Sequence, residues 1–335
     1  MMLFDPTRRS LARSHPASPS DAESPPARRR AARLALHAAI GLLFLVLFLR
    51  QIDPHGVAAA AEQAWILPIV VALLAYALDF LLRAARFWIL LEAVSGRRLP
   101  LLRVPGPFIA SFGISDLLPL RAGDVFRLLW FQRQMALPPS GVLGAMMIER
   151  AFDLFTLLLF AIAVVGWHVG DAWLLYLAAL PGIGAIVLAS AMLARRMRKA
   201  TMRWAWLNGL VAAVDAFSIL RSIRLTCALL GLSLLCWLLE SLVLLGAWIS
   251  LGGSAGDWLA PMAAFVTSTL GTLFPGLPGH FGTFELFGLE MFARTGVAPD
   301  FAAAVLLLAH LLLWAPTALF AIAWLPFSRS KKAAQ

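Results

Sequence analysis

The chain has 335 residues, of which 61% are hydrophobic and 14% are charged, and its mean hydropathy is +0.83. This is the composition of an integral membrane protein, and it excludes an ordinary soluble fold. A net charge of +10 would favour nucleic-acid binding in a soluble protein. In a membrane protein the basic residues orient the spans instead, so we expect no nucleic-acid partner.

Three regions follow from the distribution of apolar residues. Residues 1–33 are rich in Arg, Pro, Ser and Ala and predict a disordered basic cytoplasmic tail. Residues 34–326 predict a single integral-membrane domain, and residues 327–335 predict a short basic cytoplasmic tail. About six apolar runs approach the ~20 residues that cross a bilayer, at 34–49, 64–82, 142–166, 172–193, 225–250 and 301–325. Residues 202–220 predict an amphipathic interfacial helix.

Basic residues give these spans a direction. Loops 51–63, 167–171 and 251–258 contain no Lys or Arg, whereas the loops on the opposite side hold clusters of arginine. Because cytoplasmic loops carry the excess of positive charge, both termini are predicted to lie in the cytoplasm.

Two further apolar stretches are each broken by a short run of proline, glycine and charge, at residues 118–127 and 274–285. Broken backbone at membrane depth survives only where it is buried in protein or lines a polar cavity. Residues 104–138 must leave and rejoin the cytoplasmic side, and residues 258–297 the outer side. The predicted fold is therefore an all-α polytopic membrane protein, with about six full transmembrane helices and two re-entrant helical hairpins of opposite orientation, arranged as an inverted repeat.

The first break holds two arginines and a carboxylate. Arg121 and Arg127 flank the break, and Asp124 lies three residues from each. Either the three charges neutralise one another, or one guanidinium stays free for a lipid phosphate, which arginine binds in a bidentate manner. A helix that starts near Val125 would add its free N–H groups to a phosphate site.

Charged residues also lie inside the third apolar run. Glu149 and Asp153 share one helix face, and Arg150 is three residues from Asp153. These side chains form either a network that holds the helix against the first break or part of a binding site. Two carboxylates and one arginine leave one net negative charge on this helix, which is available to pair with Arg83 or Arg86.

Two other predicted spans also contain or border charged residues. Asp79 and Arg83 are four residues apart and are expected to pair. Arg86 is placed at the cytoplasmic interface, where it either extends its charge to water or contacts a ligand. Glu240 lies mid-span with no obvious partner, which makes it a candidate for function.

The second break contains glycines at every third position, and these are expected to leave backbone accessible to a ligand: Gly276, Gly279 and Gly282. A helix is predicted to begin near Thr283, with that residue as its N-cap. Glu285 then lies in the first turn, where it either stabilises the helix end or recognises a cationic or hydroxyl-rich headgroup. His280 is either a proton-linked switch or a neutral, hydrogen-bonded histidine.

Several of these motifs recur together in one known family, in the order Arg86-Phe87-Trp88, Leu118-Pro119 to Arg127, Glu149-Arg150 to Asp153, Trp237 to Glu240 and Pro275 to Glu285. Over about residues 35–325 the chain resembles the lysylphosphatidylglycerol synthase transmembrane region, a flippase-like family. It departs from the family pattern at Asp124, usually Glu, and at His280-Phe281. The resemblance implies a multi-pass protein of the bacterial inner membrane that handles aminoacylated, polyprenyl-linked or hopanoid lipids.

The sequence contains none of three common motifs for enzymatic catalysis: Gly-x-Ser-x-Gly, His-Glu-x-x-His and the P-loop pattern. We therefore expect no enzyme activity, no cofactor and no metal. The leading hypothesis is a flippase-like or scramblase-like transporter that moves a phosphate-bearing lipid headgroup between leaflets. Its alternatives are a subunit that presents lipid to a separate glycosyltransferase or other lipid-modifying enzyme, and an integral-membrane lipid transferase.

Overall fold

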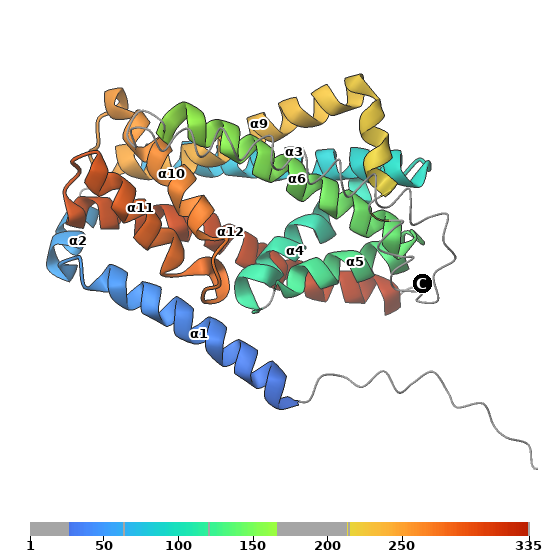
Figure 1. The fold of residues 1–335 in the computed structure, drawn as a ribbon, viewed down its shortest axis with the longest axis horizontal. Coiled ribbons are helices and arrows are strands. Elements are labelled where there is room, and N and C mark those ends of the chain that lie inside the picture. Colours follow the sequence, from blue (N-terminus) through green and yellow to red (C-terminus); the bar gives the residue numbers. More distant parts are fainter. Residues whose placement is uncertain (1–26, 63, 120, 166–212, 214, 334–335) are drawn as a thin grey trace, which may run out of the picture.

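The computed structural model describes residues 27–62, 64–119, 121–165, 213 and 215–333 (Figure 1). Helices make up the ordered part of this region, and no strand occurs within it. The protein is therefore an all-α membrane protein, as predicted. The predicted span at 172–193 and most of the predicted interfacial helix at 202–220 lie outside the described residues.

Three described helices are long and apolar enough to cross a membrane: α3 (Ile66–Ser95), α9 (Ile223–Ser250) and the Pro299–Pro326 part of α12 (Pro299–Ala333). A fourth span is formed if α1 (Ala27–Leu49) and α2 (Pro54–Ala61), which meet at a bend of 77°, cross together. These elements correspond to four of the six predicted spans.

Helix α6 (Pro139–Val165) matches the predicted span at 142–166 and has 27 residues. It differs from the other long helices because Glu149, Arg150 and Asp153 interrupt its apolar character. A charged side chain at the centre of a bilayer costs about 2.5–3.5 kcal/mol on insertion scales. The charges of α6 must therefore be compensated by neighbouring helices.

Both predicted breaks separate pairs of short helices. The first pair is α4 (Pro105–Leu117) and α5 (Ala122–Gln134). The second is α10 (Leu259–Gly271) and α11 (Thr283–Arg294), with the short η5 (Pro278–His280) between them. Each pair packs as a hairpin. The direction in which each hairpin enters the membrane and the inverted repeat stay predictions.

Short 3-10 turns complete the described elements: η1 (Leu101–Arg103), η3 (Ala216–Arg221) and η4 (Ala255–Asp257). Several predicted boundaries differ from the structure. Helix α1 begins at Ala27, so residues 27–33 are helical rather than part of a disordered tail. Helix α12 continues to Ala333, past the predicted boundary at 327. Helix α3 continues to Ser95 instead of ending at residue 82, because its later charges are buried rather than placed at an interface.

The helices form two groups that α12 joins. In Figure 1, α12 (red) runs from the group of α10 and α11 to the group of α4 and α5, and it packs against α4 and α11. The start of α3 is tied to the end of α9, since the Trp65 amide donates to the Ser250 carbonyl at 2.8 Å and Ser250 Oγ donates to the Trp65 carbonyl at 2.9 Å. Helix α3 also packs along α9.

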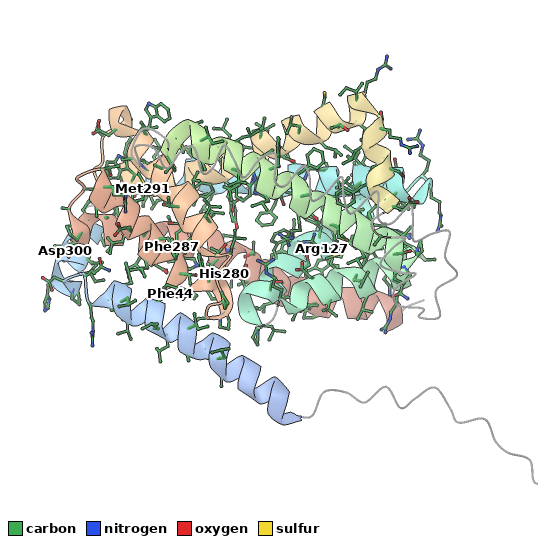
Figure 2. All side chains as sticks on the ribbon, viewed as in Figure 1. Phe44, Arg127, His280, Phe287, Met291 and Asp300 are labelled. Carbon is green, nitrogen blue, oxygen red and sulfur yellow. The ribbon has the colours of Figure 1, made fainter. Side chains whose placement is uncertain are left out.

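Helix α1 lies at the edge of the molecule and contacts the second hairpin. Phe44 packs near Phe287 of α11 and Phe274 of the second break, with ring centroids 6.0 and 6.4 Å apart (Figure 2). Towards its N-terminal end α1 diverges from the other helices (Figure 1). The second break is thus held between α1 and the body of the protein.

The predicted orientation can be tested by labelling. Arg98 and Ala255 are both exposed, and the charge distribution places Arg98 inside and Ala255 outside. We expect Ala255→Cys to react with a membrane-impermeant maleimide in intact cells, and Arg98→Cys to react only after lysis. The opposite labelling pattern would overturn the orientation and with it the direction of both hairpins.

Candidate functional site

The two breaks face one cavity of about 850 Å³. The first break contributes residues from Ser115 to Asp124, and the second contributes Thr272 to His280. The rest of the wall comes from α3, α6, α9 and α12 and from the helices that flank the breaks, α4, α5, α10 and α11. Two irregular segments that are far apart in the chain therefore share one site, as expected for broken backbone that lines a polar cavity.

Nine of the thirteen residues predicted for the site line this cavity: Arg121, Asp124, Arg127, Arg150, Asp153, Glu240, Gly276, Gly279 and His280. The other four are not among its lining residues: Arg86, Glu149, Gly282 and Glu285. A role of any of the thirteen in ligand binding stays a prediction.

Arg83 connects the carboxylates of three helices. Its Nε lies 2.8 Å from Asp79 on the same helix, which confirms the predicted pair. Its guanidinium also pairs with Glu240 of α9, and it lies 4.0 Å from Asp153 of α6. Glu240 is therefore not the unpaired carboxylate that the sequence suggested.

Arg86 is fully buried rather than placed at the interface, so the expectation that it reaches water is wrong. Its Nη1 lies 2.6 Å from Asp153, and its Nη2 lies 3.7 Å from Glu149. The extra negative charge of α6 is thus neutralised by Arg86 of α3, which was one of the predicted arrangements. Because α3 continues as a helix beyond residue 82, Arg86 faces α6 instead of the membrane surface.

Arg127 is 1% exposed and pairs with Glu149 at 2.7 Å, not with Asp124. The rings of Phe108 and Phe112 lie 4.4 and 4.8 Å from its guanidinium carbon, an arrangement that favours a cation electrostatically. Neither predicted role fits: Arg127 does not neutralise the break with Asp124, and its guanidinium is not free for a phosphate. It joins the first hairpin to α6 (Figure 2).

Arg121 is the arginine that remains at the cavity surface. Asp124 pairs with Arg150 at 3.2 Å, so the carboxylate nearest to Arg121 in sequence is already engaged. Arg121 is exposed, lines the cavity and makes no ion pair with a described residue. Its backbone adopts φ 52° immediately before α5, so it stands at the positive end of that helix.

Gly279 shapes the second side of the cavity. Its φ of 70° is unfavourable for residues with a side chain, and a Cβ there would lie 2.9 Å from the Trp314 ring. Gly276 also lines the cavity, where its backbone is half-buried. Gly279 is buried and its carbonyl oxygen contacts His310, so accessible backbone is not seen there, and a ligand contact at Gly276 stays a prediction.

Gly282 and Glu285 have structural roles in this arrangement. A Cβ at Gly282 would collide with the backbone of Leu45, so this glycine allows α1 to approach. Glu285 is 1% exposed and accepts a hydrogen bond from the Gly282 amide at 2.7 Å. The carboxylate therefore caps α11, the first of its two predicted roles. Thr283 is the first helical residue, and Gly282 takes the predicted N-cap position.

His310 of α12 holds the second break in place. Its Nδ1 lies 2.5 Å from Glu285, and its Nε2 lies 2.7 Å from the Gly279 carbonyl oxygen. His280 lines the cavity, but its Nδ1 is buried with no hydrogen-bond partner among the described residues. The hydrogen-bonded histidine of this site is thus His310 rather than His280.

In addition to this geometry, the chain matches a known protein family. The family model described as the lysylphosphatidylglycerol synthase transmembrane region matches residues 34–321. The chain belongs to this family. The matched region contains every predicted site residue and both breaks. A search of curated proteins found no match to the chain.

Sequence reasoning missed several polar residues that this lysylphosphatidylglycerol synthase transmembrane-region protein places on the cavity wall: Tyr76, Asp116, His310, Trp314 and Thr317. Tyr76 donates to the Leu313 carbonyl at 2.7 Å, and Thr317 donates to Asp116 at the same distance. The signal for Asp116 and His310 was available, because an ionisable residue inside an apolar run is a candidate for function by default.

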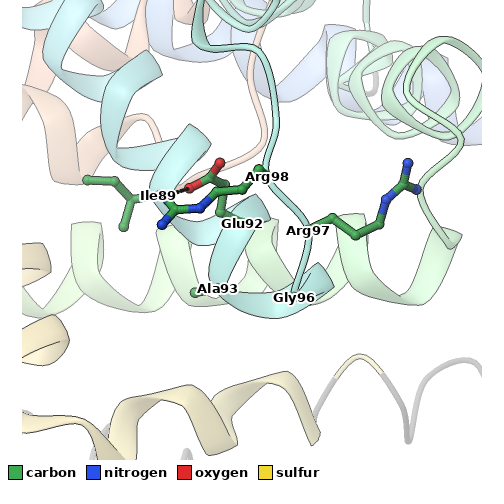
Figure 3. Close-up of a pocket in the computed structure, with 6 residues that line it drawn as sticks. All are labelled: Ile89, Glu92, Ala93, Gly96, Arg97 and Arg98. Carbon is green, nitrogen blue, oxygen red and sulfur yellow. Dashed lines mark ion pairs between the residues drawn. The ribbon is translucent and has the colours of Figure 1, made fainter.

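A smaller cavity lies outside this site, at the C-terminal end of α3 (Figure 3). Glu92 pairs there with Arg98 at 3.7 Å, whereas Arg97 points away from this pair. Arg97 and Arg98 are exposed whereas Arg83 and Arg86 are buried, so the predicted orientation near α3 rests on exposed loop arginines such as these.

We expect Gly279→Ala to impair the site, because the new Cβ strains the backbone and displaces Trp314. A residue forced into such a conformation costs about 1–3 kcal/mol. Gly296→Ala is a matched control, since Gly296 has φ 78° and open space around it. Lipid movement in vesicles should fall for Gly279→Ala and stay at the wild-type rate for Gly296→Ala. Equal rates for all three proteins would show that Gly279 does not shape the site.

Proposed function

We propose that this protein is a lipid transporter of the flippase or scramblase type, which moves a phosphate-bearing headgroup between leaflets through the cavity between the two breaks. The observation that carries the proposal is Arg121, an exposed arginine that makes no ion pair with a described residue and stands at the start of α5 on the cavity wall. Arginine binds phosphate through several charge-assisted hydrogen bonds. The free N–H groups at the helix start favour the same anion.

The rest of the wall supports passage of a headgroup. A bare headgroup cannot cross hydrocarbon without losing its hydration, which makes the crossing slow. Fixed charges and backbone dipoles along the cavity replace part of that hydration. The acyl or prenyl tails would stay in the surrounding lipid. No nucleotide-binding motif occurs in the sequence, so movement would be downhill or coupled to an ion.

We also propose that the protein lies in the bacterial inner membrane with both termini in the cytoplasm, and that its partners are lipids with anionic or phosphate-bearing headgroups. The family match and the apolar helices support a multi-pass membrane protein. One observation favours a second function: the cavity has a volume of about 850 Å³, which is enough to hold a headgroup. A subunit that presents lipid to a separate enzyme would need only such a binding cavity.

Vesicle assays with purified protein separate these functions. We expect protein alone to move a fluorescent phosphate-headgroup lipid between leaflets. Movement or modification of the lipid only after a partner enzyme is added would favour a presenting subunit. A new covalent lipid product from protein alone would identify a transferase. Native mass spectrometry of lipids that co-purify with the protein would identify the headgroup.

A further inference from the structure

Asp116 differs from the other carboxylates of the cavity wall. The three others among the described residues are each ion-paired with an arginine: Asp124, Asp153 and Glu240. Asp116 is partly buried at the end of α4 and makes no ion pair with a described residue. Its carboxylate Oδ2 instead lies 2.7 Å from the hydroxyl of Thr317 in α12.

The hydroxyl of Thr317 has two acceptors within reach. Its Oγ1 lies 2.7 Å from Asp116 Oδ2 and 2.9 Å from the carbonyl oxygen of Trp314. A threonine hydroxyl has a single proton to donate, and it can also accept. If Asp116 is ionised, both neighbours are acceptors and only one of the two contacts is a hydrogen bond. If Asp116 carries a proton, it donates to Thr317, Thr317 donates to Trp314, and both contacts are satisfied.

The same face of α12 reaches the second break. His310, Trp314 and Thr317 are spaced by four and three residues, which places them on one side of the helix. The Trp314 ring occupies the space beside Gly279, and its indole N–H lies 3.4 Å from the Asp116 carbonyl oxygen. His310 binds the Gly279 carbonyl. Asp116 of the first hairpin and Gly279 of the second break therefore contact the same face of α12.

We propose that Asp116 is a proton-binding site, and that its proton is linked to occupancy of the cavity by a phosphate headgroup. The linkage to a phosphate headgroup rests on the proposed function, whereas the proton-binding site itself does not. The proton binds a carboxylate oxygen of Asp116 and returns to water when it leaves, so no other reactant is needed.

Charge explains the linkage. A phosphate at Arg121 adds an anion to the cavity that already holds Asp116, and two anions in a poorly solvated site repel one another. A proton on Asp116 removes this repulsion. By thermodynamic reciprocity, the proton favours phosphate binding and phosphate binding favours the proton to the same extent.

Other charged and titratable groups face the same cavity, and each bears on the titration of Asp116: Tyr76 and Arg83 of α3, Arg121, Asp124 and Arg127 of the first hairpin, Arg150 and Asp153 of α6, Glu240 of α9, His280 of η5 and His310 of α12. All but Tyr76, Arg121, His280 and His310 belong to the ion-paired network described above. Asp116 is thus the carboxylate of this wall that makes no ion pair with a described arginine, and an added phosphate meets its charge without a paired cation in between.

Infrared difference spectroscopy of the purified protein tests the proton site without any lipid. We expect a protonated-carboxyl band that grows as the pH is lowered, shifts in D₂O and is lost in Asp116→Asn. Glu290→Gln removes an exposed carboxylate that pairs with Arg294, and it should leave the band unchanged. Thr317→Val should shift the band without removing it, and this shift decides the question if Asp116→Asn does not fold. A spectrum that neither Asp116→Asn nor Thr317→Val alters would overturn the proton site.

Calorimetry tests the linkage. A short-chain phosphate lipid is titrated into the protein in buffers that differ in ionisation enthalpy, which reports protons taken up on binding. We expect proton uptake with wild type and with Glu290→Gln, and none with Asp116→Asn. Lipid binding without proton uptake would overturn the linkage and leave the transporter proposal intact. An Asp116 band in a protein that binds no lipid would leave the proton site intact and overturn the transporter proposal.

Discussion

Replacing Arg121 with Gln should abolish most headgroup binding while the protein stays folded. The side chain is exposed and makes no ion pair with a described residue, so its removal leaves no buried charge behind. A hydrogen bond to a charged group contributes about 1.5–3 kcal/mol, which corresponds to a loss of roughly tenfold to a hundredfold in affinity. Binding of a short-chain phosphate lipid, measured by calorimetry, gives this ratio directly.

Arg133→Gln is the matched control, because Arg133 is an exposed arginine of the same helix that does not line the cavity. Its affinity for the lipid should equal that of wild type. If both variants bind equally well, the phosphate is held elsewhere and Arg121 has no special role. If both lose affinity equally, the effect is one of overall charge.

Replacing Arg127 with Gln should instead destabilise the fold. Arg127 and Glu149 are both buried, and loss of the arginine removes the nearer cation from the carboxylate, which keeps only Arg86 at 3.7 Å. Breaking a buried ion pair in this way costs about 3–5 kcal/mol. Thermal unfolding in detergent should show a large decrease in stability and a reduced yield of folded protein.

The double variant Arg127→Gln with Glu149→Gln provides the control for this prediction, because it removes both charges together. It should recover part of the lost stability. An Arg127→Gln protein that is as stable as wild type but binds no lipid would reverse the roles that the geometry gives to the two arginines.

The sequence predicted the elements of the fold better than the partners of its charges. Hydropathy located the long helices, and proline and glycine located both breaks, because these signals depend on local composition. The pairing of Asp79 with Arg83 was also predictable, since both lie on one helix turn. Contacts between helices leave no such local signal.

Arg121 and Arg127 illustrate what sequence spacing alone does not predict. Both flank the same break at equal distance from Asp124, so sequence spacing gave them equivalent roles. The structure distinguishes them because α5 begins at Ala122, which turns Arg127 towards Glu149 of α6 and leaves Arg121 at the cavity surface. Arg86 was misplaced for a related reason: α3 continues past the apolar run to Ser95, and the buried arginine pairs with Asp153 of α6, a contact between helices that the sequence does not reveal.

The central claim is that a lipid headgroup enters the cavity between the two breaks. Photo-crosslinking tests it most directly, with a phosphate lipid that carries a photoreactive group on its headgroup and wild-type protein in vesicles. After digestion, mass spectrometry should find the headgroup attached to peptides from both breaks, around Arg121 and around Gly279, and the Arg121→Gln protein should give much less of both. Attachment confined to the outer, lipid-facing sides of α1, α3 and α9, with no label at either break, would contradict the claim.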